Sequence, residues 1–313
     1  MKKIGFLILS FIFVFQVCGE KIHEAAMNGD IDLVKKELAK RIDINLCDKD
    51  GRPVIMHAIR SGQAKMVKFL LENNANPNIK NKWGDTSLIY AASNGNNEIL
   101  NLLLKTKVGI DEKNDLGETA LMEASLQGHL EIAKTLILKG ADVNNRSKDL
   151  STALMRAAFK GHKDLVMILL EHGADPNIKE KQGFTSLFFA VAPNNASAEI
   201  VNLLIKAKVK IDEKSDLGET ALMRASWQGH LDLVKILISK GADVNNKSKD
   251  QGTALMRAAI GGHKDVVILL LENGAHADMR DKDQKTAFNY AEESGNQVIA
   301  NILEDYLKTN QKN

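Results

Sequence analysis

Histidines recur in this chain at a fixed spacing, and histidine is a residue type that often serves as a metal ligand or a general base. Four of the eight histidines form pairs that are 33 residues apart, His129 with His162 and His230 with His263. Equivalent residues of stacked helical repeats lie roughly 10 Å apart, whereas zinc ligands lie within about 2.3 Å of their ion. We therefore interpret these histidines as structural residues of a recurring turn, and we expect no metal site.

Other residues that could support catalysis also recur with the same period. Asp142 with Asn144, and Asp243 with Asn245, are typical turn residues, because their side chains bond to nearby backbone. The sequence contains no phosphate-binding glycine loop, no nucleophile elbow and no His-Glu metal helix. An enzyme would need a cluster of titratable groups in a pocket, which this spacing does not offer. We expect no catalytic residue, no cofactor and no enzyme activity.

The elements that carry these residues are short repeats. Thr119-Ala120-Leu121-Met122 recurs from Thr152, Thr220 and Thr253, and looser copies begin at Pro53, Thr86, Thr185 and Thr286. Successive copies start 33 residues apart, except that Thr185 and Thr220 are 35 apart, with the two extra residues around Pro193. Self-similarity at this period is typical of solenoid folds.

Each repeat has the same predicted internal order. A polar turn leads to the threonine, whose hydroxyl can cap a short helix that begins there. Gly128 and His129 interrupt the chain, a second helix follows with apolar residues at helical spacing, and Gly140 ends it. The run Ala141-Asp142-Val143-Asn144 leads into the next turn.

This pattern resembles the ankyrin repeat over about residues 20–307. The resemblance implies an all-α solenoid of stacked helix-turn-helix units with short hairpin turns. One departure is that Ala120 and Met122 stand where the family usually has proline and histidine. The hydrogen bonds of that histidine between repeats would be missing, so we expect packing of the methionines to compensate.

No linker interrupts the array, so we expect one domain over residues 20–313. Residues 20–50 are predicted to form an N-terminal cap repeat, residues 51–285 seven repeats, residues 286–307 a C-terminal cap repeat and residues 308–313 a polar tail. Residues 116–149 match residues 217–250 at 26 of 34 positions, which indicates duplication of a three-repeat block.

Partners of ankyrin repeats usually lie against the turn tips and the concave face of the first helices. Aromatic residues and arginine, which are concentrated in protein interfaces, occupy the corresponding positions of this chain. The predicted partner-binding residues are Trp83, Tyr90, Leu126, Arg156, Phe159, Phe184, Phe189, Arg224, Trp227, Arg257 and Ile260. We expect the site to centre on Trp227 with Arg224 and Arg257, and the recurring arginines favour an acidic ligand. The alternative, that some of these side chains pack as core, stays open, above all for Phe159 and Leu126.

The first residues indicate export. Lys2 and Lys3 precede an apolar run from Ile4 to Val17, which is the pattern of a secretory signal peptide. As a helix this run would measure roughly 21 Å, less than the roughly 30 Å of a hydrocarbon core, so a bare membrane anchor is the weaker interpretation. A buried core helix is also weaker, because the run lacks a polar face and precedes the first repeat. We expect residues 1–19 to be removed before Glu20, or Cys18 to carry the lipid of a bacterial lipoprotein.

The remaining composition limits the class of partner. Removal of Lys2 and Lys3 leaves 40 basic and 40 acidic side chains, so net charge gives no indication of nucleic-acid binding. The chain has two cysteines, and Cys18 is expected to be removed or to carry a lipid. Cys47 would then be the one free thiol of the mature chain and could not form an internal disulfide. We interpret it as a small packing residue.

Together these observations predict a monomeric, non-enzymatic scaffold that binds a protein or peptide outside the cytoplasm of a bacterium. It would be periplasmic, outer-membrane-associated or secreted, with membrane contact only through a lipid on Cys18. The alternative is an accessory or protective subunit of a periplasmic enzyme.

Overall fold

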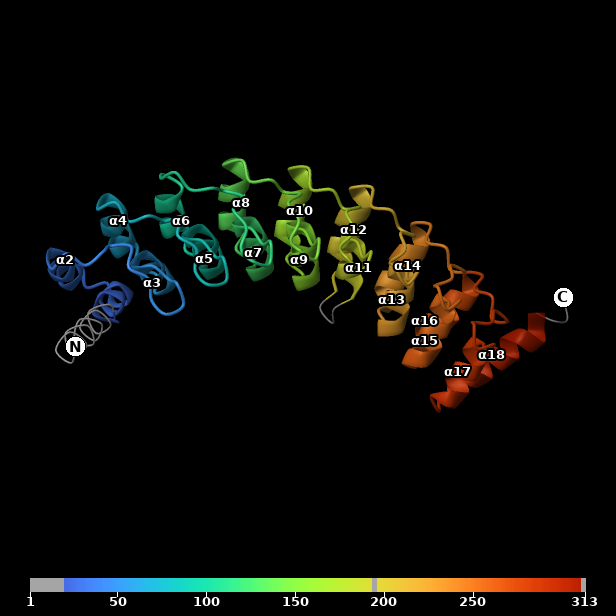
Figure 1. Ribbon diagram of the computed structural model, residues 1–313. Coiled ribbons are helices and arrows are strands. Elements are labelled where there is room, and N and C mark those ends of the chain that lie inside the picture. The colour runs from blue at the N-terminus through green and yellow to red at the C-terminus, as the bar shows by residue number, and fades with distance from the viewer. Residues whose placement is uncertain (1–19, 193–195, 311–313) are drawn as a thin grey trace, which may run out of the picture. The chain divides into compact units, whose positions relative to one another are not determined.

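The computed structural model describes residues 20–192 and 196–310, in which pairs of α-helices are joined by short turns (Figure 1). The expected signal peptide, residues 1–19 with Cys18, lies outside the described residues, as do Pro193, Asn194, Asn195 and residues 311–313. The chain divides into two compact units, of which the first ends at Lys148 and the second begins at Asp149. The single uninterrupted array therefore stays a prediction.

The first unit contains helical residues 20–28 followed by seven labelled helices. Within it, α3, α5 and α7 lie side by side, as do α4, α6 and α8 (Figure 1). The helices are α2 (Ile31–Ala39), α3 (Val54–Arg60), α4 (Ala64–Glu72), α5 (Ser87–Asn94), α6 (Asn97–Leu103), α7 (Ala120–Gln127) and α8 (Leu130–Leu138).

The second unit repeats this arrangement. Its first helices α9, α11, α13, α15 and α17 contact one another in sequence, and its second helices do the same. The helices are α9 (Ala153–Lys160), α10 (Lys163–Glu171), α11 (Ser186–Val191), α12 (Ala198–Lys206), α13 (Ala221–Gln228), α14 (Leu231–Ser239), α15 (Ala254–Gly261), α16 (Lys264–Glu272), α17 (Ala287–Glu293) and α18 (Gln297–Asn310). The predicted all-α fold of stacked helix-turn-helix units is confirmed in both units.

Threonine caps set the start of the first helices. The hydroxyl oxygen of Thr119 accepts a hydrogen bond from the Met122 backbone N–H at 3.4 Å, and Thr220 does the same with Met223 at 3.3 Å. Such a cap is worth about 1 kcal/mol, because it satisfies a backbone donor that the helix leaves unpaired. The prediction fails at Thr185, which makes no side-chain cap bond. Gly128 ends α7 with φ 83°, a left-handed conformation that favours glycine.

The core lies between the two helices of each repeat and between neighbouring repeats. The methionines of the repeated motif are almost fully buried, with exposed fractions of 1–2% for Met122, Met155, Met223 and Met256. Ala124 and Ser125 are fully buried on α7, which packs against the preceding first helix α5. Packing of the methionines is therefore as expected from the sequence.

The recurring histidines link repeats. The ring nitrogen Nε2 of His129 lies 3.0 Å from the carbonyl oxygen of Ser93, and Nε2 of His263 lies 2.9 Å from the carbonyl oxygen of Trp227. Each bond joins the start of a second helix to the end of the preceding repeat's first helix. Hydrogen bonding between repeats is thus retained at these two positions, by a histidine other than the one the family usually uses.

Two further residues test the sequence interpretation. Asp142 accepts a hydrogen bond from the backbone N–H of Asn144 at 2.9 Å, so its assignment as a turn residue is confirmed. Cys47 is exposed in a loop that pairs with Pro53, and its interpretation as a packing residue is wrong. The loop lies ahead of the first complete repeat, where little of the chain is available to cover it.

Candidate protein-interaction sites

The first helices and the turns before them hold the candidate residues of both units. Arg224 and Trp227 lie three residues apart on α13, and side chains at this spacing share one face of a helix. The N-cap bond of Thr220 fixes where that helix begins, and the bond from His263 holds the Trp227 carbonyl at its end. The repeat thus determines where both side chains leave the backbone.

Arg224 lies between two aromatic rings. Its guanidinium carbon is 4.9 Å from the centre of the Trp227 ring and 5.5 Å from that of Phe188. Trp227 is 42% exposed, whereas Phe188 on α11 is 7% exposed. Arg224 therefore makes cation–π contacts with one buried ring, Phe188, and one solvent-exposed ring, Trp227.

The charge of Arg224 is not neutralised by the described part of the chain. Its guanidinium makes no hydrogen bond or ion pair with another described residue, and its Nε atom is buried without a partner. A buried donor without an acceptor costs about 1–3 kcal/mol. An acceptor that a ligand brings to the other nitrogens of the guanidinium would offset part of that cost.

Arg257 on α15 also has a buried Nε atom without a partner, but its charge, in contrast to that of Arg224, is paired within the chain. Its Nη2 atom lies 3.0 Å from the carboxylate of Asp250 and 3.7 Å from that of Glu219. Burial opposes ionisation of Asp250, but hydrogen bonds from Ser248 and Gly252 together with Arg257 hold the pKa of that carboxyl below its ordinary value. Of these two arginines, only Arg224 has no counter-charge among the described residues.

A cavity of about 240 Å³ opens between α13 and α15. It is lined by Glu219, Met223, Arg224, Trp227, Arg257 and Ile260. The structure thus brings together four of the residues predicted from the sequence, Arg224, Trp227, Arg257 and Ile260. The cavity can receive a small acidic group, with Trp227 covering its apolar part.

An aromatic row continues from this cavity toward α9. The ring of Phe184 stacks on Phe188 with centres 3.9 Å apart, and Phe189 lies edge-on to both Phe184 and Phe159 at 6.5 and 6.2 Å. Phe159 is 42% exposed, so part of the row faces solvent. Such a row offers apolar contact area beside the arginine.

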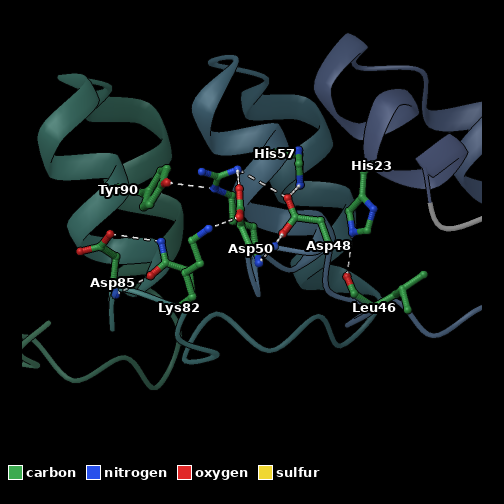
Figure 2. A network of polar contacts seen from close by, with 10 residues as sticks. His23, Leu46, Asp48, Asp50, His57, Lys82, Asp85 and Tyr90 are labelled. Atoms are coloured by element: carbon green, nitrogen blue, oxygen red, sulfur yellow. Dashed lines mark hydrogen bonds and ion pairs between the residues drawn. The ribbon is translucent and has the colours of Figure 1, made fainter. Parts of the chain in front are cut away.

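In the first unit, Tyr90 belongs to the polar network shown in Figure 2. The Arg52 Nε–H donates to the Tyr90 hydroxyl oxygen at 3.3 Å, and the guanidinium lies 5.0 Å from the Trp83 ring centre. Asp50 pairs with Arg52 at 2.9 Å and also with Lys82. The charges of Arg52 and Lys82 are thus engaged within the chain.

His57 forms the inner end of this network. Its Nε2 atom lies 3.1 Å from the Asp48 carboxylate, and its ring centre is 4.6 Å from that of His23. Burial and the nearby His23 hold the pKa of His57 below its ordinary value, against the opposing effect of Asp48. Burial also acts on Asp48, but backbone N–H groups of Arg52 and Asp50 outweigh it and lower the pKa of that carboxyl.

A second cavity, of about 550 Å³, lies in the first unit between the repeats of α5 and α7. Trp83 and Tyr90 line it, as predicted partner-binding residues, but sequence reasoning missed its acidic members. These are Asp85, Asp115, Glu118 and Glu123. One signal was available: Glu123 and Arg224 are equivalent positions of the duplicated block and have opposite charge.

Five predicted residues line neither of these two cavities; three of them, Phe159, Phe184 and Phe189, form the aromatic row. Leu126 is half-buried near the end of α7, and Arg156 is half-buried on α9. Their assignment to a binding surface stays a prediction.

Metal-ligand clusters and membrane-crossing helices are both absent from the described residues. No group of three or more histidine, cysteine or acidic side chains in residues 20–192 and 196–310 is arranged to hold a metal ion. In the same part of the chain, no helix combines the length and apolar character needed to cross a membrane.

Comparison with known proteins gives a consistent result. A family model for ankyrin repeats in three copies matches residues 22–114, 65–147, 91–180 and 154–248, and a second ankyrin-repeat model matches residues 228–271. No curated protein matches the chain significantly.

Proposed function

Because the chain belongs to the ankyrin-repeat family, whose members are typically non-enzymatic scaffolds for protein–protein interaction, we propose that its second unit binds an acidic segment of a protein or peptide. The observation that carries this proposal is Arg224, a half-buried cation between Phe188 and Trp227 that has no acceptor among the described residues. A carboxylate of the partner would lie against Arg224, since a planar guanidinium fits a carboxylate through paired hydrogen bonds.

The surrounding residues suit a peptide better than a lone anion. Trp227 and Phe159 present exposed aromatic surface, and Phe184 and Phe189 extend the row between them. Aromatic anchors of this kind supply most of the free energy of binding in protein interfaces. The partner would therefore combine an acidic side chain with neighbouring apolar ones.

The site of action that we propose is outside the cytoplasm of a bacterium, with the chain acting as a monomer. The support is the basic start at Lys2 and Lys3 and the apolar run to Val17. Intact-mass spectrometry of the native protein should find a chain that begins at Glu20 or at a lipid-modified Cys18. An unprocessed Met1 in the cytoplasmic fraction would refute export.

The binding site is tested by capture from the envelope fraction followed by affinity measurement with the purified partner. Trp227→Ala removes an aromatic anchor, so we expect it to weaken binding about thirtyfold, the effect of a typical hot-spot residue. Arg224→Gln should reduce binding and make the remainder insensitive to salt, because it removes the charge.

Met167→Ala is the matched control, because Met167 is also an exposed apolar residue of the second unit but lies on the second helix α10. It should bind as the unmodified chain does. A partner that is lost equally with all three variants, or with none, would contradict the site. Co-purification in fixed stoichiometry with an envelope enzyme would instead favour a permanent accessory subunit.

A further inference from the structure

The acidic cavity of the first unit is a separate feature with a distinct chemistry. Its volume of about 550 Å³ falls within the range of roughly 300–1,000 Å³ that is usual for ligand sites. Side chains of α5 and α7 and of the turns that precede them form its walls. Among the described residues that line it there are four carboxylates and no lysine, arginine or histidine.

Two of these carboxylates have no cationic partner in the described chain. Asp85 accepts hydrogen bonds from the neutral amides of Asn81 and Asn114, at 3.1 and 2.9 Å. Asp115 is exposed at the next turn, and its backbone N–H donates to the Trp83 carbonyl at 2.9 Å, which holds it beside that residue. Both negative charges are therefore directed at a space that a ligand can enter.

The backbone is adapted to this proximity. Gly84 has φ 78°, and a Cβ atom placed there would lie 2.6 Å from the Asp115 backbone nitrogen. Any larger residue would push the two turns apart. The short distance between Trp83 and Asp115 thus depends on glycine.

The aromatic wall of the cavity attracts cations. Lys82 Nζ lies 4.5 Å from the Trp83 ring centre, and the Arg52 guanidinium lies 5.0 Å from it. Arg52 and Lys82 form ion pairs with Asp48 and Asp50, so these two cations do not neutralise Asp85 or Asp115. Trp83 is still 43% exposed, which leaves ring surface for a ligand.

The duplicated block supplies an independent comparison. Residues 116–149 and 217–250 differ at 8 of 34 positions, and the only reversal of charge among them is Glu123 against Arg224. Another of the eight differences is Leu126 against Trp227. Glu123 lines the cavity of the first unit and Arg224 that of the second, so two nearly identical copies carry opposite charges at the same position of their cavities.

We propose that the cavity of the first unit binds a lysine or arginine side chain of a protein or peptide partner. The cationic group lies between Asp85 and Asp115, and its aliphatic stem lies against Trp83. This inference rests on the general role of the chain as a binding scaffold, but it uses none of the residues around Trp227.

The two tryptophans of the chain allow each cavity to be observed separately, since Trp83 lines one and Trp227 the other. In the full-length Trp227→Phe variant, fluorescence reports on Trp83 alone. The probes are blocked pentapeptides of alanine with two arginines, two lysines or two glutamates. The arginine and lysine probes should change the fluorescence of Trp83 in a saturable, salt-sensitive manner, and the glutamate probe should not.

Two substitutions test the carboxylates of the cavity. Asp115→Asn and Asp85→Asn should each weaken binding of the basic probes about threefold or more, in line with the strength of exposed ion pairs. Glu98→Gln is the control, because Glu98 is an exposed carboxylate of the same unit on the second helix α6. It should leave the affinity unchanged. Urea midpoints of all three variants show whether any loss is due to unfolding.

Charge exchange gives a sharper test. Glu123→Arg should reduce the affinity for the basic probes and increase that for the glutamate probe, because it converts the position to the charge of its copy. A glutamate probe that binds the unmodified cavity as well as the arginine probe would overturn the inference, and so would the absence of any response to millimolar basic probe.

The identity of the occupant is tested by sedimentation over a range of protein concentrations. A constant monomer mass supports an external partner. A dimer that Asp115→Asn dissociates would show that a second copy of the chain occupies the cavity, and would overturn the assignment. If no partner binds at Trp227 but the fluorescence of Trp83 still responds to the basic probes, the proposed function is contradicted and this inference is not.

Discussion

Alanine substitution of Trp227 and of Phe188 should lower the free energy of unfolding by different amounts, because one ring lies at the surface and the other in the core. Both rings contact the Arg224 guanidinium, but Phe188 is 7% exposed and Trp227 is 42% exposed. Truncation of a fully buried aromatic residue costs about 3–5 kcal/mol in unfolding free energy. We expect about 3–4 kcal/mol for Phe188→Ala, which also loses the stacked contact with Phe184.

For Trp227→Ala the expected loss is about 2 kcal/mol or less. The exposed part of the ring contributes nothing to folding, and the cation–π contact with Arg224 accounts for about 0.5–1 kcal/mol of the total. The sequence alone could not give this intermediate value, because it does not show how much of the ring the neighbouring repeat covers.

Urea unfolding followed by circular dichroism, with hydrogen exchange at the amides of α13 as a local measure, tests this order. Fluorescence is unsuitable as the common probe, since Trp227→Ala removes one of the two tryptophans. A loss of unfolding free energy for Trp227→Ala that equals or exceeds that of Phe188→Ala would show that Trp227 is core. The interpretation of this face as a binding surface would then fail.

Three other predictions concern the two ends of the array. The pKa of His57 in the folded chain lies below its ordinary value of 6.5, so the unfolded chain protonates His57 more readily. The free energy of unfolding of the first unit should therefore fall as the pH drops below about 6.5. Urea midpoints between pH 7.5 and 5 should show this fall, and His57→Gln should reduce it. The hydrogen bond to Asp281 raises the pKa of Tyr290 to about 12. The contribution of this bond to stability is therefore present below pH 10 and is lost between pH 10 and 12. The absorbance step near pH 12 that marks ionisation of Tyr290 should be missing in Tyr290→Phe. Deletion of residues 286–313 removes α17 and α18 and uncovers the apolar sides of α15 and α16, so size-exclusion chromatography should find aggregates. A soluble monomer with an unchanged urea midpoint would contradict stacking.

The fold could be predicted because the same sequence features recur in successive repeats. The period of 33 residues, the threonine caps and the buried methionines are local features that the structure confirms at Thr119, Thr220 and their equivalents. Thr185 shows the limit, since the same residue type in the same position makes no cap bond.

The candidate sites were predictable only in part. Periodicity indicated that Arg224 and Trp227 share a face, but it could not show that Arg257 is neutralised by Asp250 and Glu219. Such pairing depends on distances between side chains of different repeats. The acidic cavity was missed for the same reason, since Asp85 and Asp115 belong to different turns and resemble ordinary turn residues one at a time.

The hydrogen bonds between successive turns have a consequence for how this chain can diversify. The backbone N–H of Asp115 donates to the carbonyl of Trp83, that of Lys148 to Leu116, and that of Lys249 to Leu217. Because both atoms of each bond belong to the backbone, the stacking of the turns tolerates replacement of the side chains they display. A copied repeat can therefore change the charge of its exposed side chains by point mutation while its attachment to the neighbouring repeat is kept. Selection for a new ligand and selection for a stable stack then act on different atoms of the same residues.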